Sequence, residues 1–111
     1  GIIQCLLEYF PAAASTINDN GLVPLHVVCN NKNVTRSMVQ LLIDAAPNSV
    51  RSVDEDGWMP LHHFCSCNKV DGAIEILNLL VEKYPEALRH VDNNFGFLPI
   101  HIASGASIAG C

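Results

Sequence analysis

A short motif recurs three times along the chain and limits the folds that the chain can adopt. Its copies are GLVPLHVVC at 21–29, GWMPLHHFC at 57–65 and GFLPIHIAS at 96–104. Each has a Gly, two residues, a Pro, a Leu or Ile and a His, and consecutive copies start 36 and 39 residues apart. A period of roughly 20 to 50 residues is typical of proteins built from stacked supersecondary units.

The residues between these motifs repeat as well. The repeated stretches are IIQCLLEYFPAAASTIND at 2–19, MVQLLIDAAPNSVRSVDE at 38–55 and ILNLLVEKYPEALRHVDN at 76–93. When they are aligned on their Pro residues, the apolar positions agree, as at Leu6, Leu42 and Leu80. This agreement indicates that one structural unit is used several times.

The local pattern predicts two helices in each unit. Apolar residues recur at helical spacing in 38–46 and 74–84, and a Pro follows each stretch and helps to end the helix. The shorter PLHVVC-type segment begins with a Pro at a first-turn position, where the missing N–H does no harm. Clusters of Asp, Asn and Gly between units predict tight turns in which the Gly adopts positive φ.

These motifs and their spacing resemble the ankyrin repeat. The resemblance covers nearly the whole chain and implies an all-α fold, an ankyrin-type α-solenoid of stacked helix-turn-helix units joined by turn or hairpin loops. It divides a single domain into the second helix of a partial repeat at 1–17, repeats at 18–53 and 54–91, and a partial repeat at 92–111.

Two departures from the family pattern affect these expectations. The period exceeds the usual value of about 33 residues, and PEALRHVD at 85–92 predicts a short extra turn after the second helix. The family also usually has a Thr before the Pro, and its hydroxyl caps the first helix at a gain of about 1 kcal/mol. Here that position holds Val23, Met59 or Leu98. Because these side chains cannot cap, the hydrogen-bond partner of the motif His stays open.

Charge and hydropathy exclude several kinds of partner. The chain has 6 Lys and Arg against 11 Asp and Glu, a net charge of −5, whereas nucleic-acid binding requires a basic face. We therefore expect neither a nucleic acid nor an anionic membrane surface as a partner. Membrane insertion is not expected either, because no apolar run reaches about 18 residues.

Cysteine usage bears on location. Five Cys form an odd set without the spacing of a disulfide framework, which favours reduced thiols and an intracellular protein. We expect the cytoplasm, with the nucleus as the alternative. Neither end resembles a natural terminus, so we expect a piece of a longer protein.

Catalytic patterns are missing from the sequence. It contains no Ser-His-Asp order, no nucleophile elbow and no Gly-rich phosphate loop. The three acids at 54–56 lack the spacing of an EF-hand and are best interpreted as a solvated turn. We therefore predict that the protein is not an enzyme and has no catalytic residue, cofactor or bound metal.

The stretch GWMPLHHFCSC at 57–67 is rich in His and Cys. His62 and Cys65 occupy repeat positions, so we interpret them as structural residues. His63 and Cys67 break the pattern and lie four apart, a spacing that places them on one face of a helix. A zinc or redox-thiol site around 62–67 is therefore the alternative function.

The resemblance implies a protein-binding surface formed by the turn tips and the outward residues of the first helix. Carried over position by position, it predicts as partner-binding residues Asp19, Asn20, Leu22, Asn30, Asn31, Glu55, Asp56, Trp58, Ser66, Asn94, Phe95 and Phe97.

Three of these residues follow a turn glycine and predict an apolar ladder: Leu22, Trp58 and Phe97. With acids beside it, the ladder suits a protein partner that carries a basic and apolar segment. A competing interpretation is that these side chains fold back into the core. A further alternative is that the segment is a structural spacer in a longer repeat array.

Overall fold

The computed structural model describes residues 1–67 and 72–106, and every regular element in these two ranges is helical. The α-helices are α1 (Ile2–Tyr9), α2 (Pro24–Cys29), α3 (Arg36–Ala45), α4 (Pro60–Ser66), α5 (Ala73–Lys83) and α6 (Pro99–His101). Short helical turns are η1 (Pro11–Ser15), η2 (Pro47–Arg51), η3 (Pro85–Arg89) and η4 (Ile102–Ala106). The expected partial repeat at 92–111 is thus described as far as residue 106.

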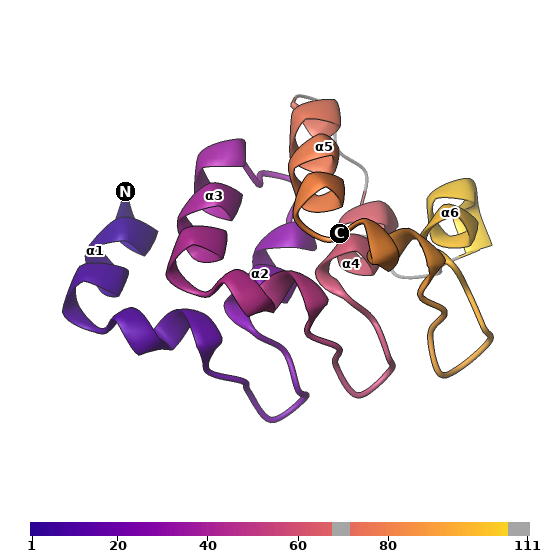
Figure 1. Cartoon of the computed structure of the whole chain (residues 1–111), viewed down its shortest axis with the longest axis horizontal. Coiled ribbons are helices and arrows are strands. Elements are labelled where there is room, and N and C mark those ends of the chain that lie inside the picture. Colours follow the sequence, from indigo (N-terminus) through magenta and orange to yellow (C-terminus); the bar gives the residue numbers. More distant parts are fainter. Residues whose placement is uncertain (68–71, 107–111) are drawn as a thin grey trace.

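The helices form an elongated stack of 39 × 29 × 24 Å. Along it, α2 packs against α3 of its own unit and against α4 of the next, and α4 packs in the same way against α5 and α6. Figure 1 shows α1 and α6 at opposite ends of the stack, with the long turns projecting from one side. The predicted all-α solenoid is confirmed.

The first helix of each unit begins as its Pro predicts, and the motif His supplies the missing cap. In each unit the backbone N–H of the residue before the Pro donates a hydrogen bond to Nδ1 of the motif His. The distances are 3.0 Å from Val23 to His26, 3.1 Å from Met59 to His62 and 2.9 Å from Leu98 to His101. An acceptor three residues along thus satisfies an N–H at the helix start, where intrahelical partners are lacking. This answers the question that the absent Thr left open.

The second helices end where their Pro residues predict. Helix α3 starts at a capping hydroxyl, since Thr35 Oγ1 accepts from the Met38 N–H at 3.2 Å, and it stops just before Pro47. Helix α5 stops before Pro85 in the same way. The 3₁₀ turns η2 and η3 follow these Pro residues. The extra turn expected in PEALRHVD is therefore confirmed, and η1 and η2 are its counterparts in the two preceding units.

The core is built from the repeated apolar positions. Leu25 and Leu61 are 0% and 2% exposed, and Leu42 and Leu80 are both 3% exposed. Burying one such side chain stabilises the fold by about 1.5–3 kcal/mol relative to leaving it in water. Repetition of these positions joins the units into one continuous hydrophobic core.

Each projecting turn is closed by an Asx side chain and a glycine. Asp54 Oδ1 accepts from the backbone N–H groups of Asp56 and Trp58 at 2.9 and 3.0 Å, and Asn18 and Asp92 have the same role in the other turns. Gly57 has φ +78°, so the predicted positive φ is confirmed. Neighbouring tips are joined by a 2.8 Å bond from the Asn93 N–H to the Asp56 carbonyl.

Candidate protein-binding surface

The twelve residues predicted to bind a partner lie on the projecting turns, on the first helices or just after them, and none is fully buried. The exposed ones are Asp19, Asn20, Asn31, Glu55, Asp56, Asn94 and Phe95. The half-buried ones are Leu22, Asn30, Trp58, Ser66 and Phe97. The fold therefore places all twelve within reach of a partner.

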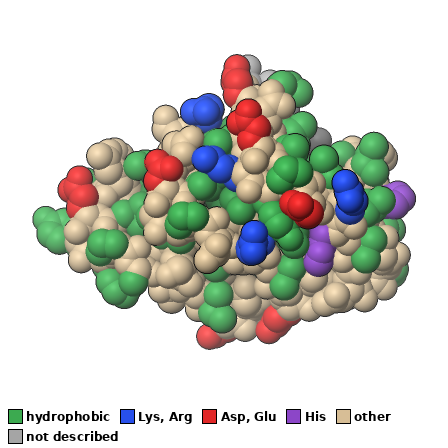
Figure 2. Space-filling view, in the orientation of Figure 1, with side chains coloured by type: hydrophobic (Ala, Val, Ile, Leu, Met, Phe, Trp, Pro, Cys, Tyr) green, Lys and Arg blue, Asp and Glu red, His purple; other side chains and the backbone are tan. Residues whose placement is uncertain are grey.

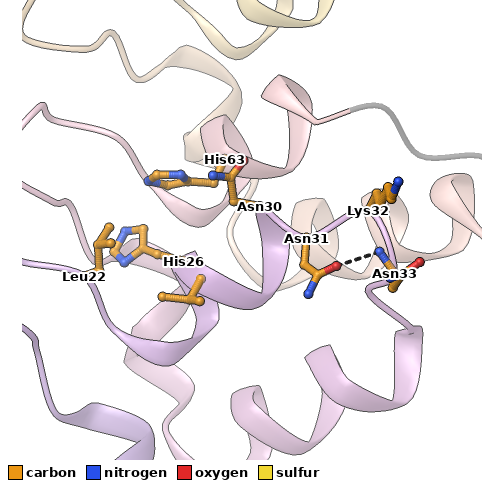
Figure 3. A pocket seen from close by; sticks show the side chains of 8 residues that line it. Leu22, His26, Asn30, Asn31, Lys32, Asn33 and His63 are labelled. Atoms are coloured by element: carbon orange, nitrogen blue, oxygen red, sulfur yellow. Dashed lines mark hydrogen bonds between the residues drawn. The ribbon is translucent and has the colours of Figure 1, made fainter. Parts of the chain in front are cut away.

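A groove of about 460 Å³ lies on the first-helix side of the first full unit. Side chains from the turn, from α2, from the loop after α2 and from α4 form its walls (Figure 3). They are Leu22, His26, Val27, Asn30, Asn31, Lys32, Asn33 and His63. The groove combines apolar side chains with amides and one lysine, a mixture that suits a peptide with both apolar and polar groups.

Sequence reasoning found only some of the residues that line this groove. Leu22, Asn30 and Asn31 were predicted, whereas the contributions of Val27 and Lys32 were missed. Val27 holds the same place in its unit as His63, and a helical projection of the PLHVVC segment would have put it on the outer side. Lys32 lies in the loop between the two helices, whose path the repeat pattern does not specify.

His63 fixes the far wall of the groove. Its Nε2 lies 2.7 Å from Asp54 Oδ2, which ties helix α4 to the turn that precedes it. The imidazole ring also lies edge-on to His26 and Trp58, with ring centroids 5.2 and 5.0 Å apart. A residue that the repeat does not explain thus has a structural role in shaping the candidate surface.

Trp58 is held between two units. Its indole Nε1–H donates to Asp92 Oδ2 at 3.0 Å, and its ring stacks on His62 at 6.0 Å with an interplanar angle of 24°. Burial raises the pKa of Asp92, but the N–H groups of Phe95, Trp58, Phe97 and Asn94 outweigh that effect and bring the pKa below its usual 3.8.

His26 joins its own unit to the next. Its Nε2 lies 3.0 Å from the carbonyl oxygens of both Ser52 and Trp58. Because Nδ1 accepts the N–H of Val23, the ring proton resides on Nε2 and is donated to these carbonyls. Burial, followed by the charge of His63, lowers the pKa of His26 below 6.5.

His62 is the equivalent residue of the next unit along the stack. Its Nε2 donates to the carbonyl of His90 at 2.9 Å. Burial is the main reason that the pKa of His62 lies below 6.5. His26 thus bonds to its own unit and to the next, whereas His62 bonds to the carbonyl of His90 in its own unit.

The helical geometry expected for the zinc or thiol alternative is wrong. Helix α4 ends at Ser66, and Cys67 follows it with extended backbone (φ −111°, ψ 133°), so Cys67 and His63 do not share a helical face. Both ring nitrogens of His62 already have backbone partners. Within residues 1–67 and 72–106, no group of three or more His, Cys, Asp or Glu side chains is placed to hold a metal ion.

The three side chains of the predicted apolar ladder are only partly exposed. Leu22, Trp58 and Phe97 are each half-buried, and the Phe97 ring packs 5.3 Å from that of Phe95. Acidic side chains lie beside the ladder, at the tips of the first two turns (Figure 2). Each ladder residue is therefore partly packed in the fold and keeps part of its apolar side chain exposed.

The stacked helical units, joined by projecting turns, place the protein in the class of helical repeat proteins, whose extended surfaces bind other molecules. A family model described as ankyrin repeats (3 copies) matches residues 1–90 and again residues 25–109. The chain belongs to the ankyrin-repeat family, whose members are generally non-catalytic modules for protein–protein interaction.

Two further findings concern relatives and membranes. No curated protein matches the chain significantly. Among the helices of the described residues, none combines the length and apolar character needed to cross a membrane.

Proposed function

We propose that the protein is a non-catalytic binding module that holds a partner protein against its turns and first helices. The observation that carries the proposal is the groove of about 460 Å³ that Leu22 and Val27 help to line. The bonds that His26 and His63 make to the neighbouring turn support a preformed surface, and preformed surfaces lose less entropy on binding.

The charges at the turn tips favour one kind of partner. Asp19, Glu55 and Asp56 are exposed at the turn tips, where their carboxylates would attract a basic segment. Half-buried Leu22 and the 53% exposed Val27 offer apolar contact a short distance away. The partner that fits is a segment with Lys or Arg next to apolar residues.

Site-specific photocrosslinking tests where a partner binds. A photoreactive amino acid placed at Val27 or Lys32 in the groove should form covalent adducts with the partner in cells. The same group at Glu82, which is exposed on α5, is the matched control and should form none. Adducts from Glu82 alone would contradict the proposal, and the absence of adducts from every position would favour the spacer alternative.

Charge reversal tests the chemistry of the partner. Glu55→Lys and Asp56→Lys change exposed tips, so they should leave the thermal unfolding midpoint nearly unchanged. We expect them to weaken binding and to reduce its dependence on salt concentration, because fewer favourable charge pairs would be screened. Glu82→Lys on α5 changes net charge equally and should leave affinity unchanged. Equal losses from all three variants would indicate a general charge effect instead.

A further inference from the structure

The segment that leads from η2 into the second projecting turn exposes every other side chain. Arg51, Val53 and Glu55 are exposed, whereas Ser52 and Asp54 between them are partly buried. The backbone at Ser52 is extended, with φ −68° and ψ 139°. Side chains two residues apart in extended backbone point the same way. One face of the segment therefore carries a cation, an apolar side chain and an anion, in that order toward the turn tip.

The neighbouring segments carry a similar order. Their exposed residues at the equivalent positions are Ser15, Ile17 and Asp19 before the first turn and Arg89, Val91 and Asn93 before the third. The three turns lie side by side (Figure 1), and backbone bonds join the second turn to the first at 3.4 Å and to the third at 2.8 Å. Together the three segments form a surface that we call the turn face.

The exposure of the turn face does not depend on either end of the chain. Its central segment has an equivalent segment on each side, and Val53 is still 48% exposed, about as much as Val91 at 49%. The Arg51 guanidinium lies over the Tyr84 ring at 5.0 Å. Among the residues that the structure describes, neither Arg51 nor Glu55 takes part in a salt bridge. Exposed apolar side chains that are rimmed by polar ones often mark an interaction site.

From this pattern we infer that a second copy of the chain covers the turn face, with the two stacks side by side and a twofold axis parallel to them. Such an axis reverses each segment against the same segment of the second copy. Val53 then meets Val53, and Arg51 meets Glu55 of the second copy, so apolar surface is buried and opposite charges pair.

The outer segments are complementary in the same arrangement. The Arg89 guanidinium of one copy meets the side-chain amide of Asn93 in the other, and the Ser15 hydroxyl meets the carboxylate of Asp19. Each of these contacts pairs a hydrogen-bond donor with an acceptor. All three segments therefore favour the same twofold axis.

The charges disfavour the other symmetric arrangement. A twofold axis along the segments, instead of along the stack, would place Arg51 against Arg51 and Glu55 against Glu55, and like charges in contact repel. Because the favoured contact uses the same surface on both copies, it closes with two copies and the product is a dimer. About three side chains from each segment take part, against roughly 20–30 residues a side in a standard interface, so the dimer should be weak.

The turn face overlaps the candidate partner surface at its tip carboxylates. Asp19 and Glu55 belong to both, so a second copy and a basic partner compete for them. Arg51 and Val53 are not among the residues predicted to bind a partner. Substitutions at these two positions therefore test self-association separately from partner binding.

Sedimentation velocity over about two orders of magnitude in concentration, up to about 1 mM, tests the inference. The unmodified chain should change from monomer to dimer and grow no further. Arg51→Glu and Glu55→Arg each bring like charges together, so each variant alone should stay monomeric. Mixed in equal amounts they should form a heterodimer, because one copy supplies acids at both positions and the other supplies cations. Arg36→Glu and Glu82→Arg make the same charge changes at exposed positions on α3 and α5 and should dimerise normally.

Disulfide cross-linking identifies the orientation of the two copies. In a Cys5→Ser background under mild oxidation, chains that carry Ile17→Cys should become linked through position 17 of both copies. The disfavoured axis would instead bring position 17 of one copy to position 91 of the other, so a link would require a mixture of Ile17→Cys and Val91→Cys chains. Mass spectrometry of the digested dimer shows which positions are joined.

Four outcomes would overturn the inference. The unmodified chain could stay monomeric throughout, either charge variant could still dimerise alone, the two folded variants could fail to pair, or the link could join positions 17 and 91. Circular dichroism and thermal unfolding establish that each variant is folded. Val53→Glu and Val53→Arg, which meet across the axis, replace the first pair if either of its members is not folded, with the same expected results.

Discussion

The indole Nε1–H of Trp58 donates a 3.0 Å hydrogen bond to the carboxylate of Asp92, which lies 34 residues further along the chain, in the next turn. Asp92 is only 6% exposed, and its other oxygen accepts the N–H groups of Phe95 and Phe97 at 3.0 and 3.1 Å. One buried carboxylate therefore closes its own turn and also anchors a tryptophan of the preceding unit. Because this tryptophan is also one of the residues predicted to bind a partner, a substitution there changes the fold as well as the candidate binding surface.

Trp58→Phe should destabilise the fold by about 2 kcal/mol, because the partly buried carboxylate loses a charge-assisted donor. The measurement is urea unfolding of the variant, of Asp92→Asn and of the double variant, which together give the coupling energy of the pair. In the Asp92→Asn background, Trp58→Phe should cost much less. A coupling energy near zero would mean that the hydrogen bond contributes nothing and that Trp58 stabilises the fold only through its ring.

Alanine substitutions at two turn glycines distinguish the cost of backbone strain from the cost of close contact between neighbouring turns. Gly57 and Gly96 have φ of +78° and +68°, so an Ala at either position costs about 1 kcal/mol in the left-handed region. At Gly57 the new Cβ would also lie 2.9 Å from the backbone nitrogen of Asn93, whereas nothing lies within 4 Å at Gly96.

We therefore expect Gly57→Ala to lower the thermal unfolding midpoint clearly more than Gly96→Ala. The difference between the two midpoints measures how tightly neighbouring turns pack. If the two variants unfold at the same temperature, the contact between Gly57 and Asn93 is easily relaxed.

Most of the fold could be predicted from the sequence because every unit repeats the same signals. Pro24 and Pro60 start helices, and Pro47 and Pro85 follow helix ends, as the conformational limits of proline require. The cap on each first helix was not predictable from local rules, because its acceptor is a histidine ring. In His26 and His62 that ring is held by backbone carbonyl groups 26 to 32 residues further along the chain.

The candidate site was less predictable for a similar reason. Its residues on the turns follow from the repeat pattern, but the groove also depends on Lys32, in a loop of variable length, and on His63, in the following unit. The partners of Trp58 and His63 are Asp92 and Asp54, and only the stacking of units brings Asp92 to Trp58. Sequence spacing alone does not specify contacts of this kind.

His26→Ala should cost about 3 kcal/mol, because it creates a cavity and leaves the Val23 N–H and two carbonyl groups without their partner. His101→Ala is the matched control. That residue caps its own helix at 2.9 Å but is exposed, so water can replace its ring and the loss should be below about 1 kcal/mol. Urea unfolding measures both losses. Equal losses would show that the bonds between units add little to the cap.

Stability should fall as the pH drops below about 6.5, because the pKa values of His26 and His62 are lowered in the folded state from 6.5. Below pH 6.5 these side chains take up protons in the unfolded chain before they do so in the folded one. Linkage then favours unfolding as the pH falls. Asp92 adds a second loss below pH 3.8, where its carboxylate is protonated in the unfolded state first.

Urea midpoints measured from pH 8 to pH 3 test this pH dependence. A single curve sums every titrating group of the chain, so the test compares variants. His26→Ala should flatten the loss of stability between pH 7 and pH 5, and Asp92→Asn should flatten only the loss at lower pH. Imidazole NMR titration should show His26 retaining its neutral form below pH 6.5. If the urea midpoint of the unmodified chain rises as the pH falls from 7 to 5, the lowered pKa values of His26 and His62 are contradicted. Such a rise would require a folded state that binds protons more tightly than the unfolded one.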